Sequence, residues 1–252
     1  TSRRQRQMCI RDRIAADCLE TPMENIVVFS VDTDISPYDS GSYASSTTYL
    51  TGMAAVKACE QLRERIIALA AVRMIKDASA LTFDGENVID ESDGAKMSLF
   101  DIATASMCNN EISLEVTYSH SSPVSPPPFM AACAEIEADP ETGAIELLDY
   151  TACVDCGTVV NTNLARVQTE GGLLQGIGMT LYEDIWYDER GKNLSNSFMQ
   201  YKVPSRLDTD RIRVEFDSSY EPTGPFGAKS IGEIVINSPA PAIADAVYNA
   251  VS

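Results

Sequence analysis

The chain has 252 residues, of which 44% are hydrophobic and 22% are charged, the balance of an ordinary globular protein with a buried core. No apolar run reaches the roughly 20 residues that a membrane-spanning helix requires, so we expect none. The net charge of −18 disfavours a nucleic-acid partner, because phosphates are bound by Lys and Arg. The single histidine, His120, excludes a multi-histidine metal site, and the seven irregularly spaced cysteines fit a reducing cytoplasm better than a disulfide scaffold.

The first 13 residues differ in composition from the rest of the chain. They contain five Arg and one Asp, whereas the remainder is strongly acidic. The segment also resembles translated sequencing-adapter read-through of the kind found in assembled metagenomic genes. We therefore expect residues 1–13 to be a non-native or disordered basic head, and residues 14–252 to form the functional region.

Strand and helix signals follow one another irregularly in the first half of the chain. Residues 25–32 are rich in β-branched and aromatic side chains, which predicts a buried strand. A loop of small polar residues follows at 34–48. Apolar residues three and four apart then predict a long helix that ends near Ala78. The acidic stretch from Asp84 to Asp101 predicts a loop with a short helix.

The middle of the chain predicts more strands. Apolar alternation over 111–118 predicts a strand, whereas four Pro within 122–128 exclude an interior one. Residues 129–138 and 144–154 flank the turn sequence Asp139–Gly143, which predicts a β-hairpin.

The last third combines both kinds of signal. The Gly-rich stretch 171–178 lies within a helical pattern, which indicates close backbone packing or the approach of a ligand. Residues 198–202 and 212–216 predict short strands. The Ser-Pro pair at 238–239 predicts the N-cap of a terminal helix that reaches Ala250. Because strands and helices do not alternate strictly, we expect an α+β fold.

Three segments carry side chains suited to chemistry. Cys153 and Cys156 have the spacing of half a metal site, but without a second pair we interpret them as two buried thiols near a strand end. The hydroxyl-rich stretch 42–48 could cradle an anion or be an ordinary polar loop. The glycine-rich loop 224–233 ends in Glu233 just before an apolar run. A carboxylate held in apolar surroundings could act as a base, but on the residues alone an exposed loop carboxylate is the favoured interpretation.

Five segments of the chain are each too common to identify a protein family alone, but their joint occurrence in this order is specific. In chain order they are Tyr43–Gly52, Cys133–Gly143, Asp155–Asn161, Glu170–Gly178 and Gly227–Glu233. They resemble the cofactor loop, the hairpin, two pterin-side segments and the active-site loop of the xanthine dehydrogenase and aldehyde oxidase family. The resemblance extends from about Asn25 to Asn249, which implies that nearly the whole chain is the second half of a molybdenum-cofactor-binding region.

The resemblance also implies roles for individual residues. Glu233 would be the general base of a hydroxylation that uses oxygen derived from water. Gln175 would hydrogen-bond the pterin of the cofactor, and no protein side chain would ligate the metal. Further cofactor contacts would come from backbone and hydroxyl groups of Ala44, Ser45, Ser46, Thr47 and Gly232.

Cofactors and partners follow from the same resemblance. It implies molybdopterin with molybdenum, in the cytosine dinucleotide form that is common in bacterial relatives. In the family the substrate clamp, the iron–sulfur clusters and FAD lie outside the region that matches. We therefore expect a molybdenum-binding subunit, or a fragment of one, whose partners are a large molybdenum subunit, an iron–sulfur subunit and an FAD subunit.

The residues after Glu233 bear on the substrate. Ile234 and Val235 stand where many relatives have Pro-Pro. The tail from Ile234 to Ala242 resembles the purine and nicotinate hydroxylase branch of the family, which favours an N-heterocycle over an aldehyde. An aldehyde or carbon monoxide dehydrogenase is the second enzyme interpretation. The competing interpretation is a non-catalytic acidic binding module. It would explain the charge of the chain, but not the joint presence of the glycine loops, Gln175 and Glu233.

Overall fold

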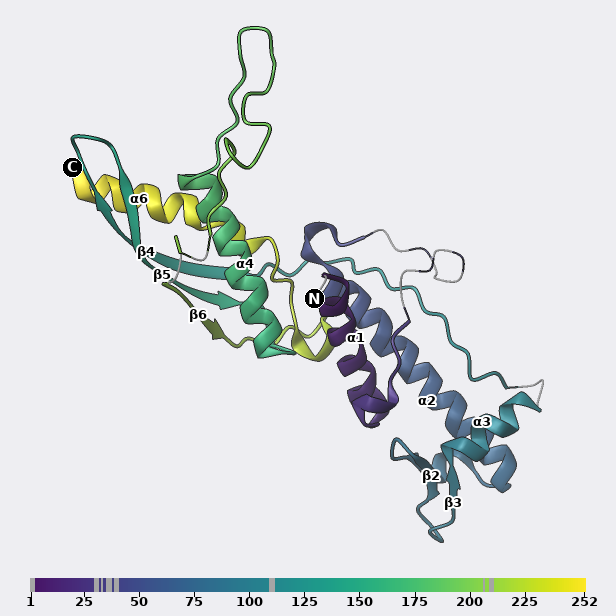
Figure 1. The fold of residues 1–252 in the computed structure, drawn as a ribbon. Helices are drawn as coiled ribbons and strands as arrows, with labels where there is room; N and C mark the ends of the chain where they lie inside the picture. The colour runs from purple at the N-terminus through teal and green to yellow at the C-terminus, as the bar shows by residue number, and fades with distance from the viewer. Residues whose placement is uncertain are drawn as a thin grey trace. The chain divides into compact units, whose positions relative to one another are not determined.

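A computed structural model describes residues 3–29, 32, 34, 38, 41–108, 112–205, 207–208 and 211–252, with side chains from residue 10 onward. The chain forms two compact units. The first contains residues 1–41, 46–124 and 223–225, and the second contains 42–45, 125–222 and 226–252. Both units combine helices with a three-stranded sheet, which confirms the expected α+β class (Figure 1).

The first unit contains two long helices and a small antiparallel sheet. In chain order its elements are α1 (Arg3–Leu19), η1 (Met23–Asn25), η3 (Thr47–Thr51), α2 (Gly52–Met74), η4 (Ala78–Ala80), β1 (Leu81–Phe83), β2 (Asn87–Asp90), β3 (Lys96–Ser98) and α3 (Leu99–Met107). The long helix predicted up to Ala78 is confirmed as α2, which ends at Met74. The boundary expected at residue 13 falls inside α1.

The core of this unit lies between α2 and the sheet. Apolar residues three and four apart place Ile66, Leu69 and Ala70 on one face of α2, where they pack with Phe83 and Val88. These five residues are at most 3% exposed. Burial of each large side chain contributes about 1.5–3 kcal/mol to stability, so this face holds the helix on the sheet.

The second unit is a sheet covered by two helices on one face. Its elements are η2 (Tyr43–Ser45), β4 (Phe129–Ala138), β5 (Ile145–Asp155), α4 (Thr162–Leu181), β6 (Ile212–Asp217), α5 (Ile234–Asn237) and α6 (Pro239–Val251), and the short turn η5 (Pro225–Gly227) begins in the first unit. β4 and β5 are antiparallel, which confirms the predicted hairpin, and β5 pairs in parallel with β6.

The core of the second unit follows from strand alternation. Tyr150, Ala152 and Val154 on β5 point to one face and are fully buried. The helices α4 and α6 cover this face (Figure 1). Leu173 of α4 and Ile243 of α6 belong to the same buried cluster as these strand residues. On the other face the alternate residues of β4 are exposed, so this side of the sheet is free of helices within this unit.

Glycines in α4 allow its close packing. A Cβ atom at Gly172 would lie 2.3 Å from Cγ2 of Val235, and one at Gly176 would lie 2.6 Å from Cγ of Pro239. The backbone of α4 therefore touches α5 and the start of α6 directly. This confirms the close packing that the glycine-rich helical pattern predicted.

Two predicted strands are wrong for their described residues, because β propensity yields a strand only where a partner completes the hydrogen-bond ladder. Residues 26–29 form no strand, and Val27 and Phe29 are 89% and 70% exposed. Residues 112–118 do alternate in burial. There, however, the guanidinium of Arg65 donates to the backbone carbonyls of Ser113 and Glu115 in place of a strand.

Three smaller predictions are corrected. The strand predicted at 198–202 is a turn, in which the amides of Gln200 and Tyr201 donate to the carbonyl of Ser197. The acidic stretch predicted as a loop with a short helix also contains β2 and β3. The terminal helix is confirmed as α6, but Ser238 does not cap it, because its hydroxyl is hydrogen-bonded to the phenol of Tyr150 at 2.8 Å.

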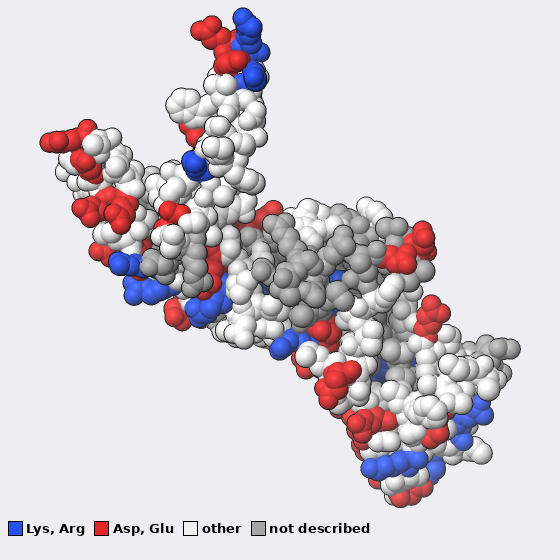
Figure 2. Space-filling view, in the orientation of Figure 1, with Lys and Arg blue, Asp and Glu red and all other residues white. Residues whose placement is uncertain are grey.

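Acidic side chains dominate the charge of the surface. Figure 2 shows them gathered at the turn end of the β4–β5 hairpin, where Glu137, Asp139, Glu141 and Glu146 are exposed. A polyanion would be repelled from this part of the surface. Within the described ranges, no helix is both long and apolar enough to cross a membrane.

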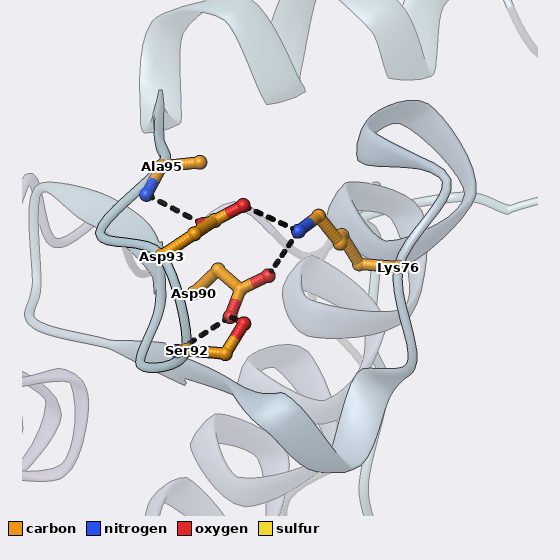
Figure 3. A network of polar contacts seen from close by, with 5 residues as sticks. All are labelled: Lys76, Asp90, Ser92, Asp93 and Ala95. Carbon is orange, nitrogen blue, oxygen red and sulfur yellow. Dashed lines mark hydrogen bonds and ion pairs between the residues drawn. The ribbon is translucent and has the colours of Figure 1, made fainter.

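A polar network joins the end of α2 to the β2–β3 turn in the first unit (Figure 3). The ammonium of Lys76 lies 2.8 Å from Oδ2 of Asp90 and 2.6 Å from Oδ2 of Asp93. The other carboxylate oxygen of Asp90 accepts hydrogen bonds from the amide and hydroxyl of Ser92. The hydrogen bond from Lys76, followed by those from Ser92, lowers the pKa of Asp90 to about 2.

We expect Asp90→Asn to lower the midpoint of thermal unfolding, because an amide cannot pair with Lys76 as a carboxylate does. The folded pKa of Asp90 lies below its unfolded value of about 3.9, so its stabilising effect is complete above pH ~4 and is lost as the pH falls towards 2. Calorimetry of both proteins between pH 2 and 7 tests this. The midpoints should differ at pH 7 and converge near pH 2; a constant difference would contradict the account.

Candidate functional site

Residues 226–233 form a loop that is hydrogen-bonded to the segment after β5. The amide of Lys229 donates to the carbonyl of Cys156 at 2.7 Å, and the amide of Thr158 donates to the carbonyl of Gly227 at 2.8 Å. Both bonds join segments far apart in sequence. The loop is therefore fixed to the end of β5 within the second unit.

Two glycines allow this close approach. A Cβ atom at Gly157 would lie 2.3 Å from the carbonyl oxygen of Gly227, and one at Gly227 would lie 2.4 Å from the ring of Tyr220. Both glycines also have positive φ, +71° and +86°. A side chain at either position would clash with its neighbours and strain the backbone. The close approach of the loop to the end of β5 therefore requires glycine at both positions.

A buried ion pair anchors the same loop. Nζ of Lys229 lies 2.7 Å from Oδ2 of Asp155, and the side chains are 9% and 16% exposed. Oδ1 of Asp155 accepts hydrogen bonds from the amide of Gly157 at 2.8 Å and the hydroxyl of Ser219 at 2.7 Å. The Lys229 ammonium also lies 5.4 Å from the ring centroid of Phe129, within range of a cation–π contact. These protein groups thus replace the water that would otherwise stabilise the two charges.

The protonation of Asp155 follows from these contacts. Burial alone would raise the pKa of its carboxyl, but the hydrogen bonds from Lys229, Gly157 and Ser219 outweigh burial and leave the pKa below its ordinary value. The carboxylate is therefore ionised at neutral pH and can hold Lys229 in place.

The anchored loop carries Gly232 to Ser45. A Cβ atom at Gly232 would lie 2.7 Å from Oγ of Ser45 and 3.7 Å from Nε2 of Gln168. Three segments that are far apart in sequence, the 42–45 turn, α4 and the 226–233 loop, therefore meet at one place in the second unit. The absence of a side chain at Gly232 leaves room for the hydroxyl of Ser45.

The 42–45 turn has an uncommon backbone. Ala44 and Ser45 have φ values of 49° and 54°, in the left-handed region that residues other than glycine seldom adopt. Such conformations are concentrated at ligand-binding and catalytic sites, where the surroundings enforce them. Ser46 and Thr47, which were predicted to contact the cofactor together with Ala44 and Ser45, belong to the first unit.

The open face of α4 carries two glutamines. Gln168 and Gln175 are seven residues apart, or about two turns, so they lie on the same face. Both are exposed, and between them a Cβ atom at Gly171 would meet no atom within 4 Å. Gln175 was predicted from the sequence, whereas Gln168 was missed. The seven-residue spacing beside an open glycine was the signal that could have found it.

Glu233 follows Gly232 and directly precedes α5. Its side chain is exposed, as the residues alone had favoured for a loop carboxylate, so the described residues do not place it in apolar surroundings. The next residue but one, Val235, is fully buried and fixes the backbone on the core. An exposed carboxylate on a fixed backbone, one residue from the Ser45 contact, can accept a proton from a group bound at this place.

The two cysteines near the end of β5 differ in exposure. Cys156 is buried, as predicted, but Cys153 is exposed on β5, which corrects the interpretation of both as buried thiols. Burial, followed by the charge of Asp155, raises the pKa of the Cys156 thiol to about 11, so it is protonated at neutral pH. Across the part of the chain that the structure describes, no cluster of three or more His, Cys, Asp or Glu could hold a metal ion.

Comparison with known proteins relates this arrangement to one family. The family model described as "Molybdopterin cofactor-binding domain" matches residues 11–210. The chain is 37% identical over 240 residues to a probable hypoxanthine oxidase of Escherichia coli strain K12, covering 94% of this chain and 25% of that protein. It is 32% identical over 247 residues to 6-hydroxypseudooxynicotine dehydrogenase complex subunit gamma of Paenarthrobacter nicotinovorans, covering 95% and 31%.

Two solved structures share the fold. The Cu,Mo-CO dehydrogenase in its carbon monoxide reduced state has a TM-score of 0.83 at 26% identity, over 95% of this chain and 31% of that one. Quinoline 2-oxidoreductase from Pseudomonas putida 86 has a TM-score of 0.82 at 27% identity, over 96% and 32%. The chain thus spans about a quarter to a third of the length of these proteins.

We expect Lys229→Met to destabilise the protein by roughly 1–3 kcal/mol, because it leaves the half-buried carboxylate of Asp155 without its cation. Urea denaturation of the full chain, followed by circular dichroism, measures the change. Lys202→Met is the matched control: Lys202 is exposed, so its loss should change the free energy of unfolding by less than about 0.5 kcal/mol. Equal effects of the two substitutions would show that the pair does not anchor the loop.

Proposed function

The chain belongs to the molybdopterin cofactor-binding family of xanthine dehydrogenase-type proteins, and on this basis we propose that it forms one side of the molybdenum site of a hydroxylase. The observation that carries the proposal is the meeting of Ser45, Gly232 and Gln168 in the second unit. The reaction proposed is the oxidation of an N-heterocycle, a purine or nicotinate, with oxygen derived from water.

The residues present fit a pterin cofactor. Ser45, Gln168 and Gln175 offer a hydroxyl and two amides, which can donate to and accept from the polar edge of a pterin. Gly171 leaves the face between the two glutamines open, so a flat heterocycle can approach the backbone of α4 there, and Gly232 lets the hydroxyl of Ser45 lie against the loop. When bound, the molybdenum cofactor supplies the two-electron oxidation and the activation of water.

We assign Glu233 as the general base. Its exposed carboxylate is held on a fixed backbone beside the Ser45 contact, where it can take a proton from the oxygen donor and later return it to solvent. Ala44, Ser46 and Thr47 are assigned, with Ser45, to contacts with the cofactor through backbone and hydroxyl groups. The cofactor is proposed to be the cytosine dinucleotide form.

The relatives support a heterocyclic substrate and a multi-subunit enzyme. One relative is named as a probable hypoxanthine oxidase, and another, 27% identical over 250 residues, as the large subunit of a nicotine 6-hydroxylase from Paenarthrobacter nicotinovorans. A further relative is named as subunit gamma of a complex. We therefore propose a large molybdenum subunit, an iron–sulfur subunit and an FAD subunit as partners. Aldehydes and carbon monoxide are the alternative substrates.

We expect Glu233→Gln to reduce turnover by about 10²- to 10⁴-fold without loss of molybdenum, because Gln keeps the size of the side chain but cannot accept the proton. The assembled complex is assayed with a panel of purines and nicotinate, and molybdenum is measured on the same sample. The control is Glu141→Gln in the exposed hairpin turn, which should keep full activity. A Glu233→Gln complex with full molybdenum and normal turnover would remove Glu233 from the mechanism.

We expect Gln168→Ala and Gln175→Ala each to weaken cofactor retention by about 2- to 12-fold, which corresponds to one hydrogen bond of about 0.5–1.5 kcal/mol. Because both side chains are exposed, the thermal midpoint of the chain should hardly change. Molybdenum and pterin are measured in the assembled complex before and after extended dialysis. Retention equal to wild type in both variants would mean that this face of α4 does not contact the pterin.

A further inference from the structure

Two exposed cysteines lie on neighbouring strands of the second unit. Cys133 is in the middle of β4 and Cys153 is near the end of β5, and both are free thiols. The strand register pairs Cys153 with Ala131 and Cys133 with Thr151. The two cysteines are therefore diagonal neighbours, on adjacent strands and two residues apart along the hairpin.

Both cysteines point to the face of the sheet that is free of helices. The chain neighbours of Cys153, Ala152 and Val154, are fully buried in the core. Ala132, which precedes Cys133, packs against the same core. Because side chains alternate along a strand, the thiols of Cys133 and Cys153 lie on the opposite face, which α4 and α6 do not cover (Figure 1).

The residues paired with the two cysteines do not separate their thiols. Ala131 has only a methyl group. The hydroxyl of Thr151 donates to Oδ2 of Asp149 and accepts from Nε of Arg213, each at 3.3 Å. Arg213 belongs to β6, on the other side of β5 from β4, so this hydroxyl is engaged away from the thiols.

The diagonal spacing suits a bridging atom better than a direct bond between the sulfurs. Diagonal neighbours in antiparallel sheets lie about 7–8 Å apart, and slightly less between their Cβ atoms. Disulfides usually join Cα atoms that are only about 4.4–6.8 Å apart. A metal–thiolate bond is about 2.3 Å long, so an ion with two thiolates in line separates the sulfurs by about 4.6 Å. This longer link can span the diagonal pair.

The number of available ligands selects the kind of ion. Glu215 of β6 pairs with Cys153 and is exposed on the same face, so its negative charge attracts a cation. The described residues contain no group of three or more His, Cys, Asp or Glu that could hold a metal ion. A structural zinc ion needs four ligands. Thiolates select soft cations, and soft ions such as Hg²⁺ and Ag⁺ are satisfied by two sulfurs.

We propose that Cys133 and Cys153 form a binding site for a soft, two-coordinate cation. Each thiol loses its proton to solvent, and the two sulfurs bond the ion, one from each strand, without any change in oxidation state. The ion links β4 to β5 on the open face of the sheet. Neither cysteine belongs to the proposed cofactor site, so this proposal does not depend on the proposed function.

Titration of the full chain with Hg²⁺ tests the proposal. Each titration contains the same excess of reduced glutathione, which competes for an ion that is held by one cysteine only. Mercury bound to the protein is measured after gel filtration. We expect the wild-type chain to retain one ion, and Cys133→Ser or Cys153→Ser to weaken its binding by about 10²- to 10⁴-fold, because the second sulfur of a pair acts at a high effective concentration.

Cys108→Ser is the matched control, because Cys108 is exposed but lies outside the pair. This variant should bind Hg²⁺ as the wild type does. Wild-type binding by either Cys133→Ser or Cys153→Ser, or an equal loss in Cys108→Ser, would overturn the proposal.

Alkylation of the unsubstituted chain gives a readout that does not depend on how the variants fold. The chain loaded with one Hg²⁺ is treated with iodoacetamide, and the modified cysteines are located by fragment mass spectra. We expect Cys133 and Cys153 to be protected together while Cys108 reacts. Alkylation of either member of the pair in the loaded chain would also contradict the proposal.

Discussion

The buried ion pair between Lys229 and Asp155 is the interaction on which the candidate site depends. It joins the loop at 226–233 to the end of β5, 74 residues earlier in the chain. Removing either charge from water is unfavourable unless the other charge lies beside it. The two segments therefore stay together when the second unit is folded. Gly157 and Gly227 let the backbones touch, and the loop thereby holds Gly232 and Glu233 beside the 42–45 turn.

The sequence predicted those elements whose pattern is local. The β4–β5 hairpin has a turn sequence that contains Pro140 and Gly143, and α2 has apolar residues three and four apart, so both were predicted correctly. Residues 26–29 and 112–118 have the same strand-like composition, but a strand also needs a partner. Composition does not show whether a partner strand is present to complete the hydrogen-bond ladder. At Ser113 and Glu115 the backbone carbonyls instead accept hydrogen bonds from the side chain of Arg65.

The site was predictable in part from motifs. Glu233, Gly232 and Ser45 come from segments that resemble a known family, and the structure brings Gly232 and Ser45 together. Gln168 and the role of Lys229 were missed, because a glutamine on an exposed helix face and a lysine in a glycine-rich loop are both common. Only the fold shows that Gln168 adjoins Gly232 and that Lys229 is buried and pairs with the carboxylate of Asp155.

Molybdenum content of the assembled complex with Ala or Val at position 232 tests the central claim most directly. A Cβ atom there would lie 2.7 Å from Oγ of Ser45, so it would displace the hydroxyl that is proposed to contact the cofactor. We predict a graded loss of molybdenum and pterin, moderate in Gly232→Ala and severe in Gly232→Val, in complexes that still assemble and unfold at a near-normal temperature. Stoichiometric molybdenum in a folded Gly232→Val complex would contradict the account.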